Sequence, residues 1–196
     1  MKVIFASLFT AFSISNLMGQ TVVPAPEIQI ATAVLAAPSD QRDGAKVYGF
    51  SPEGKFTVLR AGTNEMVCLA DDPTKADISV SCYHKSLEPF MERGKELKDE
   101  GKNAKEVFDI REEEVKSGKL KMPLKPATLY ALSGTQDNYD AKTGTLKNGY
   151  LRYVVYIPYA TSETTGLPLK PDMPGMPWIM DPGTHRAHIM INPAKN

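Results

Sequence analysis

The chain has 196 residues, enough for one domain with a sizeable core, and its 23 basic side chains balance its 23 acidic ones. A neutral chain lacks the positive surface that attracts nucleic acids and anionic membrane faces, so the composition argues against both as partners. Beyond the N-terminal segment no apolar run reaches the roughly 20 residues of a membrane-spanning helix, so an integral membrane protein is not expected.

The first 19 residues have the pattern of a cleavable export signal. Lys2 precedes a mainly apolar run from Val3 to Ile14, and small residues follow at Ser15 and Gly19. A basic residue, a short apolar segment and small residues in this order are typical of a secretory signal peptide. The pattern predicts cleavage near Gly19 and a mature protein that is secreted or periplasmic. A buried N-terminal helix is the alternative interpretation.

A leader with a short helix is predicted for residues 20–45. Two prolines in residues 21–26 indicate an extended start. The alanine-rich stretch 27–36 follows Pro26, and proline fits the first turn of a helix. One α+β domain is then predicted for residues 46–196.

Two β-hairpins are predicted after the leader. Residues 46–50 and 56–60 flank a turn-forming segment, which places Phe50 opposite Phe56. Residues 64–70 and 78–84 flank a second turn-rich segment and form the other hairpin. Together they predict a four-stranded antiparallel meander.

Cys68 and Cys82 are the only cysteines of the chain. If they lie opposite each other in the second hairpin, the strand face that they share is apolar almost throughout. A cysteine pair in an exported protein is ordinarily oxidised, so we predict a disulfide. It would stabilise the fold by around 3 kcal/mol in the chain-entropy model. Two buried free thiols are the alternative.

Two helices are predicted in the middle of the chain. Ser86 is expected to cap the first, whose apolar residues recur at helical spacing as far as Leu97. The second is expected from Asn103 to Lys116. Acidic and basic residues alternate between 85 and 125, which predicts a solvated helix surface rather than a binding patch.

The last third returns to strands, predicted at residues 127–133, 149–158 and 186–191. A proline-rich loop occupies residues 166–177. Strands, then helices, then strands predict an α+β fold. We expect a mainly antiparallel sheet of about 6–7 strands with the two central helices packed on one face.

Methionine and histidine gather near the C-terminus. Thioether and imidazole groups are ligands that select Cu(I), so one hypothesis is a copper-handling segment at residues 173–190. Its candidate ligands are Met173, Met176, Met180, His185 and His188. His84 would complete a three-histidine site if the sheet brought it near. The alternative is a loop whose methionines fill gaps at the edge of the core.

Aromatic residues suggest a second candidate site. Tyr150, Arg152 and Tyr156 share one face of a predicted strand, and Trp178 is the only tryptophan. Tyrosine has an apolar face and a polar tip, so such a strip suits a sugar or a flat ligand. The alternative is that strands simply favour tyrosine.

Three functional hypotheses follow from these residues. The first is a non-catalytic exported domain that binds an unidentified small molecule or protein. The second is a periplasmic copper-handling protein. The third is a hydrolase that uses Asp181, His185 or His188, and it has the least support, because the chain contains no nucleophile-elbow, zinc-protease, phosphate-loop or dinucleotide motif.

Overall fold

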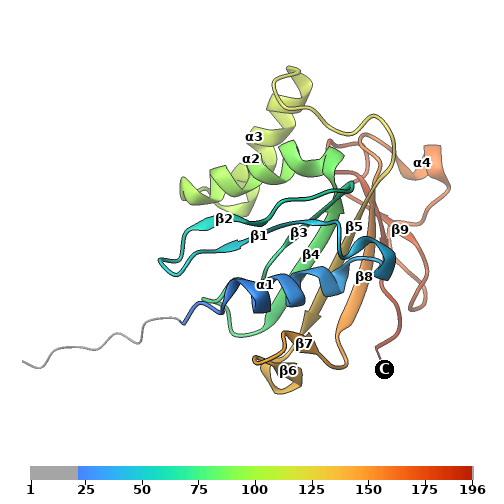
Figure 1. Cartoon of the computed structure of the whole chain (residues 1–196). Helices are drawn as coiled ribbons and strands as arrows, with labels where there is room; N and C mark the ends of the chain where they lie inside the picture. Colours follow the sequence, from blue (N-terminus) through green and yellow to red (C-terminus); the bar gives the residue numbers. More distant parts are fainter. Residues whose placement is uncertain (1–21, 196) are drawn as a thin grey trace, which may run out of the picture.

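An eight-stranded sheet organises the chain in the computed structural model, which describes residues 22–195 (Figure 1). The predicted export signal therefore lies outside the described residues. The strands of the sheet are β1 Lys46–Phe50, β2 Phe56–Arg60, β3 Met66–Leu69, β4 Ile78–His84, β5 Ala127–Gly134, β8 Tyr150–Tyr156, β9 Trp178–Met180 and β10 His188–Ile191. A separate hairpin is formed by β6 Tyr139–Asp140 and β7 Thr145–Leu146.

Helices cover both faces of this sheet. The α-helices are α1 Pro26–Ala33, α2 Glu88–Asp99, α3 Ala104–Lys116 and α4 Ser162–Thr165. α2 packs through Phe90 on one face, against Tyr83 and Tyr156. α1 lies on the opposite face, as Figure 1 shows. The predicted α+β fold is confirmed, with its mostly antiparallel sheet and its two central helices on one side.

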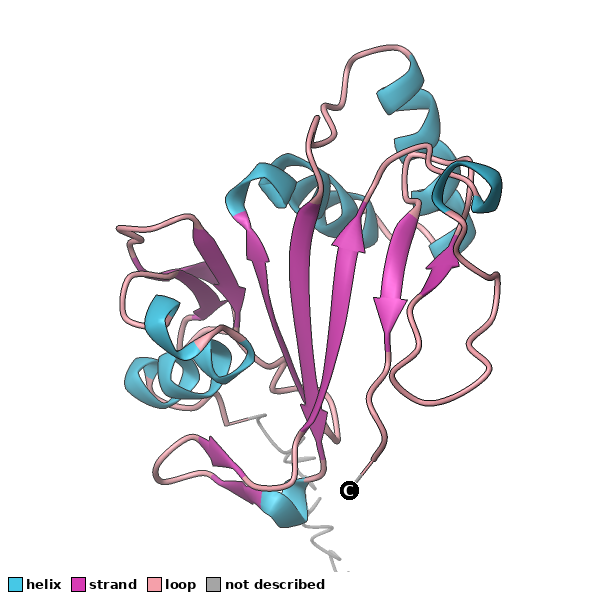
Figure 2. Ribbon diagram, turned by 90° about the vertical axis from the view of Figure 1, so that its right-hand side faces the viewer, coloured by secondary structure: helices cyan, strands magenta, loops and turns pink. Residues whose placement is uncertain are grey.

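The sheet runs in the order β2-β1-β3-β4-β5-β8-β10-β9, and Figure 2 shows its central strands face on. Every neighbouring pair is antiparallel except β1 and β3, which are parallel. The predicted meander is therefore wrong, although Phe50 does pair with Phe56. After β2 the chain crosses the end of β1 before it enters β3. Gly62 permits this crossing, because a Cβ there would lie 2.7 Å from the backbone nitrogen of Lys46.

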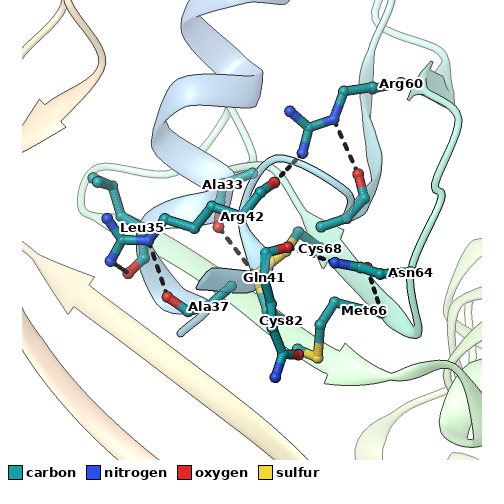
Figure 3. Close-up of a disulfide and its surroundings, with 11 residues drawn as sticks. Ala33, Leu35, Ala37, Gln41, Arg42, Arg60, Asn64, Met66, Cys68 and Cys82 are labelled. Atoms are coloured by element: carbon teal, nitrogen blue, oxygen red, sulfur yellow. Dashed lines mark hydrogen bonds between the residues drawn. A yellow bond between two sulfur atoms is a disulfide. The ribbon is translucent and has the colours of Figure 1, made fainter. Parts of the chain in front are cut away.

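The predicted disulfide is present between Cys68 of β3 and Cys82 of β4, which face each other across the hairpin. Both cysteines are 0% exposed, and the Sγ atom of Cys82 lies 3.3 Å from the carbonyl oxygen of Ala33 (Figure 3). Arg42 donates to the carbonyls that follow α1, and Asn64 donates to the carbonyl of Gln41. These contacts close the α1 side of the sheet over the disulfide.

The helix boundaries follow local signals, with one exception. The helix predicted from Asn103 to Lys116 is α3, and Asn103 caps it in a capping box with Glu106. The prediction that Ser86 caps α2 is wrong, because a 3₁₀ turn at Lys85–Leu87 precedes the helix and α2 begins at Glu88. Pro89 in the first turn explains the shift, since proline is preferred there. Within residues 22–195, no helix has the length and apolar character that crossing a membrane requires.

Candidate functional site

A groove of about 790 Å³ lies between α2 and the sheet, and we call it the α2 groove. Its lining includes Phe50, Gly54 and Phe56 of the β1–β2 hairpin, next to which α2 lies in Figure 1. Its main apolar and aromatic lining residues are Phe50, Phe56, Leu69, Phe90, Met91 and Tyr156. Its cationic lining residues are Lys75, Lys95, Lys98, Arg111 and Arg186. Two acidic residues, Asp72 and Asp99, also line it, so cations outnumber anions.

Arg111 of α3 is the most unusual side chain of the α2 groove. It is only 7% exposed, yet it makes no ion pair with any carboxylate of the described residues. Its guanidinium stacks 3.8 Å from the centre of the Phe90 ring, and its Nη1 donates to the Phe90 carbonyl at 3.1 Å. Its Nε is buried without a partner. A guanidinium has five N–H donors, and this contact uses one of them.

The surroundings of Arg111 leave its charge poorly compensated. Burial lowers the pKa of Arg111 to about 10; nearby Tyr156 opposes this shift and Arg186 adds to it. The group is therefore still positive at neutral pH. A desolvated cation–π contact contributes about 2 kcal/mol, whereas taking an ion out of water costs several. The Phe90 ring alone does not offset that cost.

Gly94 of α2 makes room for the guanidinium. A Cβ at this position would lie 2.7 Å from the Nη1 atom of Arg111. Any side chain there would push Arg111 out of its position or separate the two helices. The close approach of α2 and α3 therefore brings Arg111 to the buried part of the α2 groove.

Arg186 and Tyr156 line the groove together with Arg111. The Nε of Arg186 donates to Asp181 at 2.7 Å, so this second guanidinium has a carboxylate partner. Tyr156 is 8% exposed, and burial raises the pKa of its phenol against the opposing effect of the two arginines. The phenol therefore stays protonated at neutral pH and can donate a hydrogen bond to a ligand.

His185 lies deeper in the protein and does not line the α2 groove. Glu112 of α3 accepts hydrogen bonds from its backbone N–H at 2.8 Å and from its Nδ1 at 2.5 Å. Burial lowers the pKa of His185, although Glu112 acts in the opposite direction. The Nε2 atom is buried and has no partner among the described residues. The pair joins α3 to the segment before β10.

The other histidines have partners of their own. The Nδ1 of His188 lies 2.6 Å from the carbonyl oxygen of Arg186, and its ring packs beside Tyr156. His84 contacts Ser86 at the end of β4. Among residues 22–195, no three His, Cys, Asp or Glu side chains lie close enough together to hold a metal ion. The three histidines therefore do not share a site.

The methionines of the copper hypothesis are spread over the C-terminal segment. Met173 is exposed, and Met176 and Met180 are half-buried. Met180 of β9 stands opposite His188 of β10 in the sheet register. The predicted strand from residue 186 begins later, because a turn held by the Thr184 hydroxyl and the Asp181 carbonyl delays β10 until His188.

The residues of the proposed aromatic strip do not line one common hollow. Tyr150 bonds to the carbonyl of Pro193 and lines a different hollow, at the opposite end of β8 from Tyr156. Arg152 and Trp178 each bury a nitrogen that has no partner in the described part of the chain. Of the four residues predicted for this site, Tyr156 is the one that lines the α2 groove.

Sequence reasoning missed Arg111, because the charged residues of α3 were interpreted as a solvated surface. Val107, Arg111 and Glu114 are all buried on the same side of α3. Their spacing of four and then three residues is that of one helix face, and Val107 is apolar. This spacing is the signal in the sequence from which the burial of Arg111 could have been predicted.

The α2 groove therefore combines apolar walls, a positive charge balance and one buried cation without an anionic partner. Apolar walls with convergent polar groups are typical of small-molecule sites, and here the apolar and aromatic side chains share the lining with seven charged ones. In comparisons with known proteins, the chain matches no family model, no curated protein and no solved structure.

Proposed function

We propose that this protein is a non-catalytic, exported binding protein that holds a small molecule in the α2 groove. The observation that carries the proposal is Arg111, a buried cation that lines the groove and has no carboxylate partner in the described chain. A bound ligand would supply the missing interaction. The groove volume of about 790 Å³ falls within the range of ligand pockets in general.

The chemistry of the lining supports binding rather than reaction. Guanidinium, ammonium and aromatic groups dominate the α2 groove, and these groups hold and orient a ligand. An arginine does not give up its proton at neutral pH, so it does not serve as a general acid or base. His185 and Glu112, which have the pairing of an acid–base dyad, are buried away from the groove lining.

Two features support a location outside the cytoplasm. The first 19 residues carry the predicted export signal. The buried bond between Cys68 and Cys82 supports the same location independently, because disulfides form and persist in oxidising compartments.

The test is a map of where small molecules bind. The mature chain, with its disulfide intact and with ¹⁵N labelling, is screened against a fragment library by NMR. We expect fragments to shift the amide signals of groove residues such as Phe56, Gly94 and Lys98, and to compete with one another. Fragments that bind only beside Tyr150, or a library without a hit in the α2 groove, would contradict the proposal.

A further inference from the structure

We infer that the α2 groove selects an organic anion: a monocarboxylate with an apolar body, whose carboxylate is bound by Arg111. This inference rests on the proposed function and adds the chemical class of the ligand. It is carried by the contacts of Arg111, by the charges beside it and by the apolar walls of the groove.

The donors of Arg111 match a carboxylate. Nη1 is bonded to the carbonyl of Phe90, and Nε is buried without a partner in the described chain. Of the four N–H groups on Nη1 and Nη2, one is bonded to this carbonyl and three have no hydrogen bond among the described residues. A planar guanidinium binds a planar carboxylate through two parallel hydrogen bonds, which a neutral ligand does not provide.

The neighbouring charges indicate a single negative charge on the ligand. Arg186 lies at the same end of the groove, and Asp181 already neutralises it through a 2.7 Å contact. At the rim, Lys95 is paired in the same way with Asp99. Arg111 is the buried cation of the groove that has no such partner among residues 22–195. Lys75 and Lys98 also line the groove without an ion pair in the described chain, but both are exposed to solvent, so the one buried unmatched charge favours a monoanion over a phosphate dianion.

The walls indicate that the anion carries an apolar body. Phe56, Leu69 and Met91 give the groove an apolar wall. A hollow of about 350 Å³ shares these three residues and extends toward Tyr48. A small inorganic anion would leave this apolar surface in contact with water, whereas an alkyl or aryl chain would cover it.

Matched ligands test this class directly. The disulfide-intact mature protein is titrated with 4-phenylbutyrate, with the neutral alcohol 4-phenylbutan-1-ol and with the cation 4-phenylbutylamine, and binding is measured by calorimetry and by NMR shifts. Because hydrogen bonds to charged groups are the stronger ones, we expect the carboxylate to bind about tenfold more tightly than the alcohol, and the amine to bind most weakly.

Variants assign the preference to one side chain. Arg111→Met should remove the carboxylate preference and leave the alcohol bound in the groove. Arg111→Lys, which keeps the charge without the two-pronged geometry, should retain part of it. Lys105→Met is the matched control, because it removes one positive charge from the exposed start of α3. It should leave the preference unchanged.

The outcomes separate the two proposals. If the alcohol and the carboxylate bind the groove equally, or if Arg111→Met keeps the preference, the anion class is wrong and the binding function stands. If none of the three compounds shifts the groove signals and no library fragment does, the binding function fails as well. Circular dichroism and an intact disulfide show that each variant is folded, and the comparison of ligands on the unaltered protein needs no variant.

Discussion

The two faces of the sheet are closed in different ways. On the α1 side, the disulfide and the hydrogen bonds of Arg42 and Asn64 to backbone carbonyls join the chain to the sheet, and Arg42 is only half-buried. On the α2 side, Arg111 is buried without a carboxylate and borders a groove of about 790 Å³. One face therefore serves stability, and the other retains an unsatisfied interaction that a ligand can complete.

The α2 side also contains a charged contact that is complete. Arg93 of α2 donates from Nε and Nη2 to the carboxylate of Glu114 on α3, at 2.9 to 3.1 Å. These hydrogen bonds hold the pKa of Glu114 below its usual range, against the effect of burial. Arg93 and Arg111 thus lie at the same helix pair, and only Arg93 has an anionic partner in the described chain.

The largest effect is expected on the α1 side. Replacing both cysteines with alanine should lower the free energy of unfolding by about 3 kcal/mol, because the unfolded chain regains the freedom that the cross-link removes. Urea denaturation measures the loss. Ligand affinity in the α2 groove should stay the same, because the disulfide lies on the opposite face. If the folded variant also lost ligand affinity, the claim that the α1 side serves stability and the α2 side binding would be contradicted.

A smaller effect is expected from Thr32→Val. The Thr32 hydroxyl lies on the α1 side, 2.9 Å from the Ile28 carbonyl and 3.0 Å from both the Gly144 carbonyl and the Tyr139 hydroxyl. Removing it leaves buried polar groups without a partner, which should cost about 1–2 kcal/mol. Thermal denaturation is the measurement. Thr143→Val, at an exposed threonine, should change nothing measurable, and equal effects at both positions would contradict this account.

Acidification should weaken the α2 side. Burial lowers the pKa of both His185 and His188 below the ordinary 6.5, so the unfolded chain takes up protons at a higher pH than the folded protein does. This contribution to stability is present above pH 6.5 and is lost as the pH falls from 6.5 toward the lower pKa values of the two histidines in the folded protein. The melting temperature should decline over that interval. His188→Phe should reduce the slope.

The smallest change in stability is expected from Arg111→Met. No carboxylate of the described chain loses its partner, and a methionine can fill the same space, so the free energy of unfolding should stay within about 1 kcal/mol or rise. Arg93→Met should lower stability, since it leaves Glu114 with Lys119 alone. Denaturation of the two variants side by side tests the contrast. If Arg111→Met proves the more damaging of the two, Arg111 has a structural role and the comparison fails.

The sequence predicted the features that local patterns determine. The two-residue alternation and the cysteine pair gave the register of β3 and β4, and Asn103 marked the start of α3. The parallel pairing of β1 with β3 was not predictable in the same way. It requires the chain after β2 to pass close to the start of β1, and Gly62 makes this close approach possible. Non-local contacts of this kind leave no periodic pattern.

The candidate site was predicted less well than the fold. Tyr156 was named as part of an aromatic strip, and it instead lies beside Arg111. Arg111 was overlooked because a charged helix residue is ordinarily exposed, although its spacing from Val107 puts it on the buried face. The groove itself joins α2, the β1–β2 hairpin and the segment before β10, which are far apart in the sequence.

The position of the disulfide makes its rate of reduction a measure of the local opening of α1. The sulfur atoms lie beneath α1 and the turn that follows it, with Ala33 in direct contact. A reducing thiol has to reach a sulfur atom before it can exchange with it, so α1 must first lift from the sheet. At high thiol concentration the rate of reduction equals the rate of this lifting. Alkylation of the freed cysteines, counted by mass spectrometry, thus times the local opening of α1 in an otherwise folded molecule.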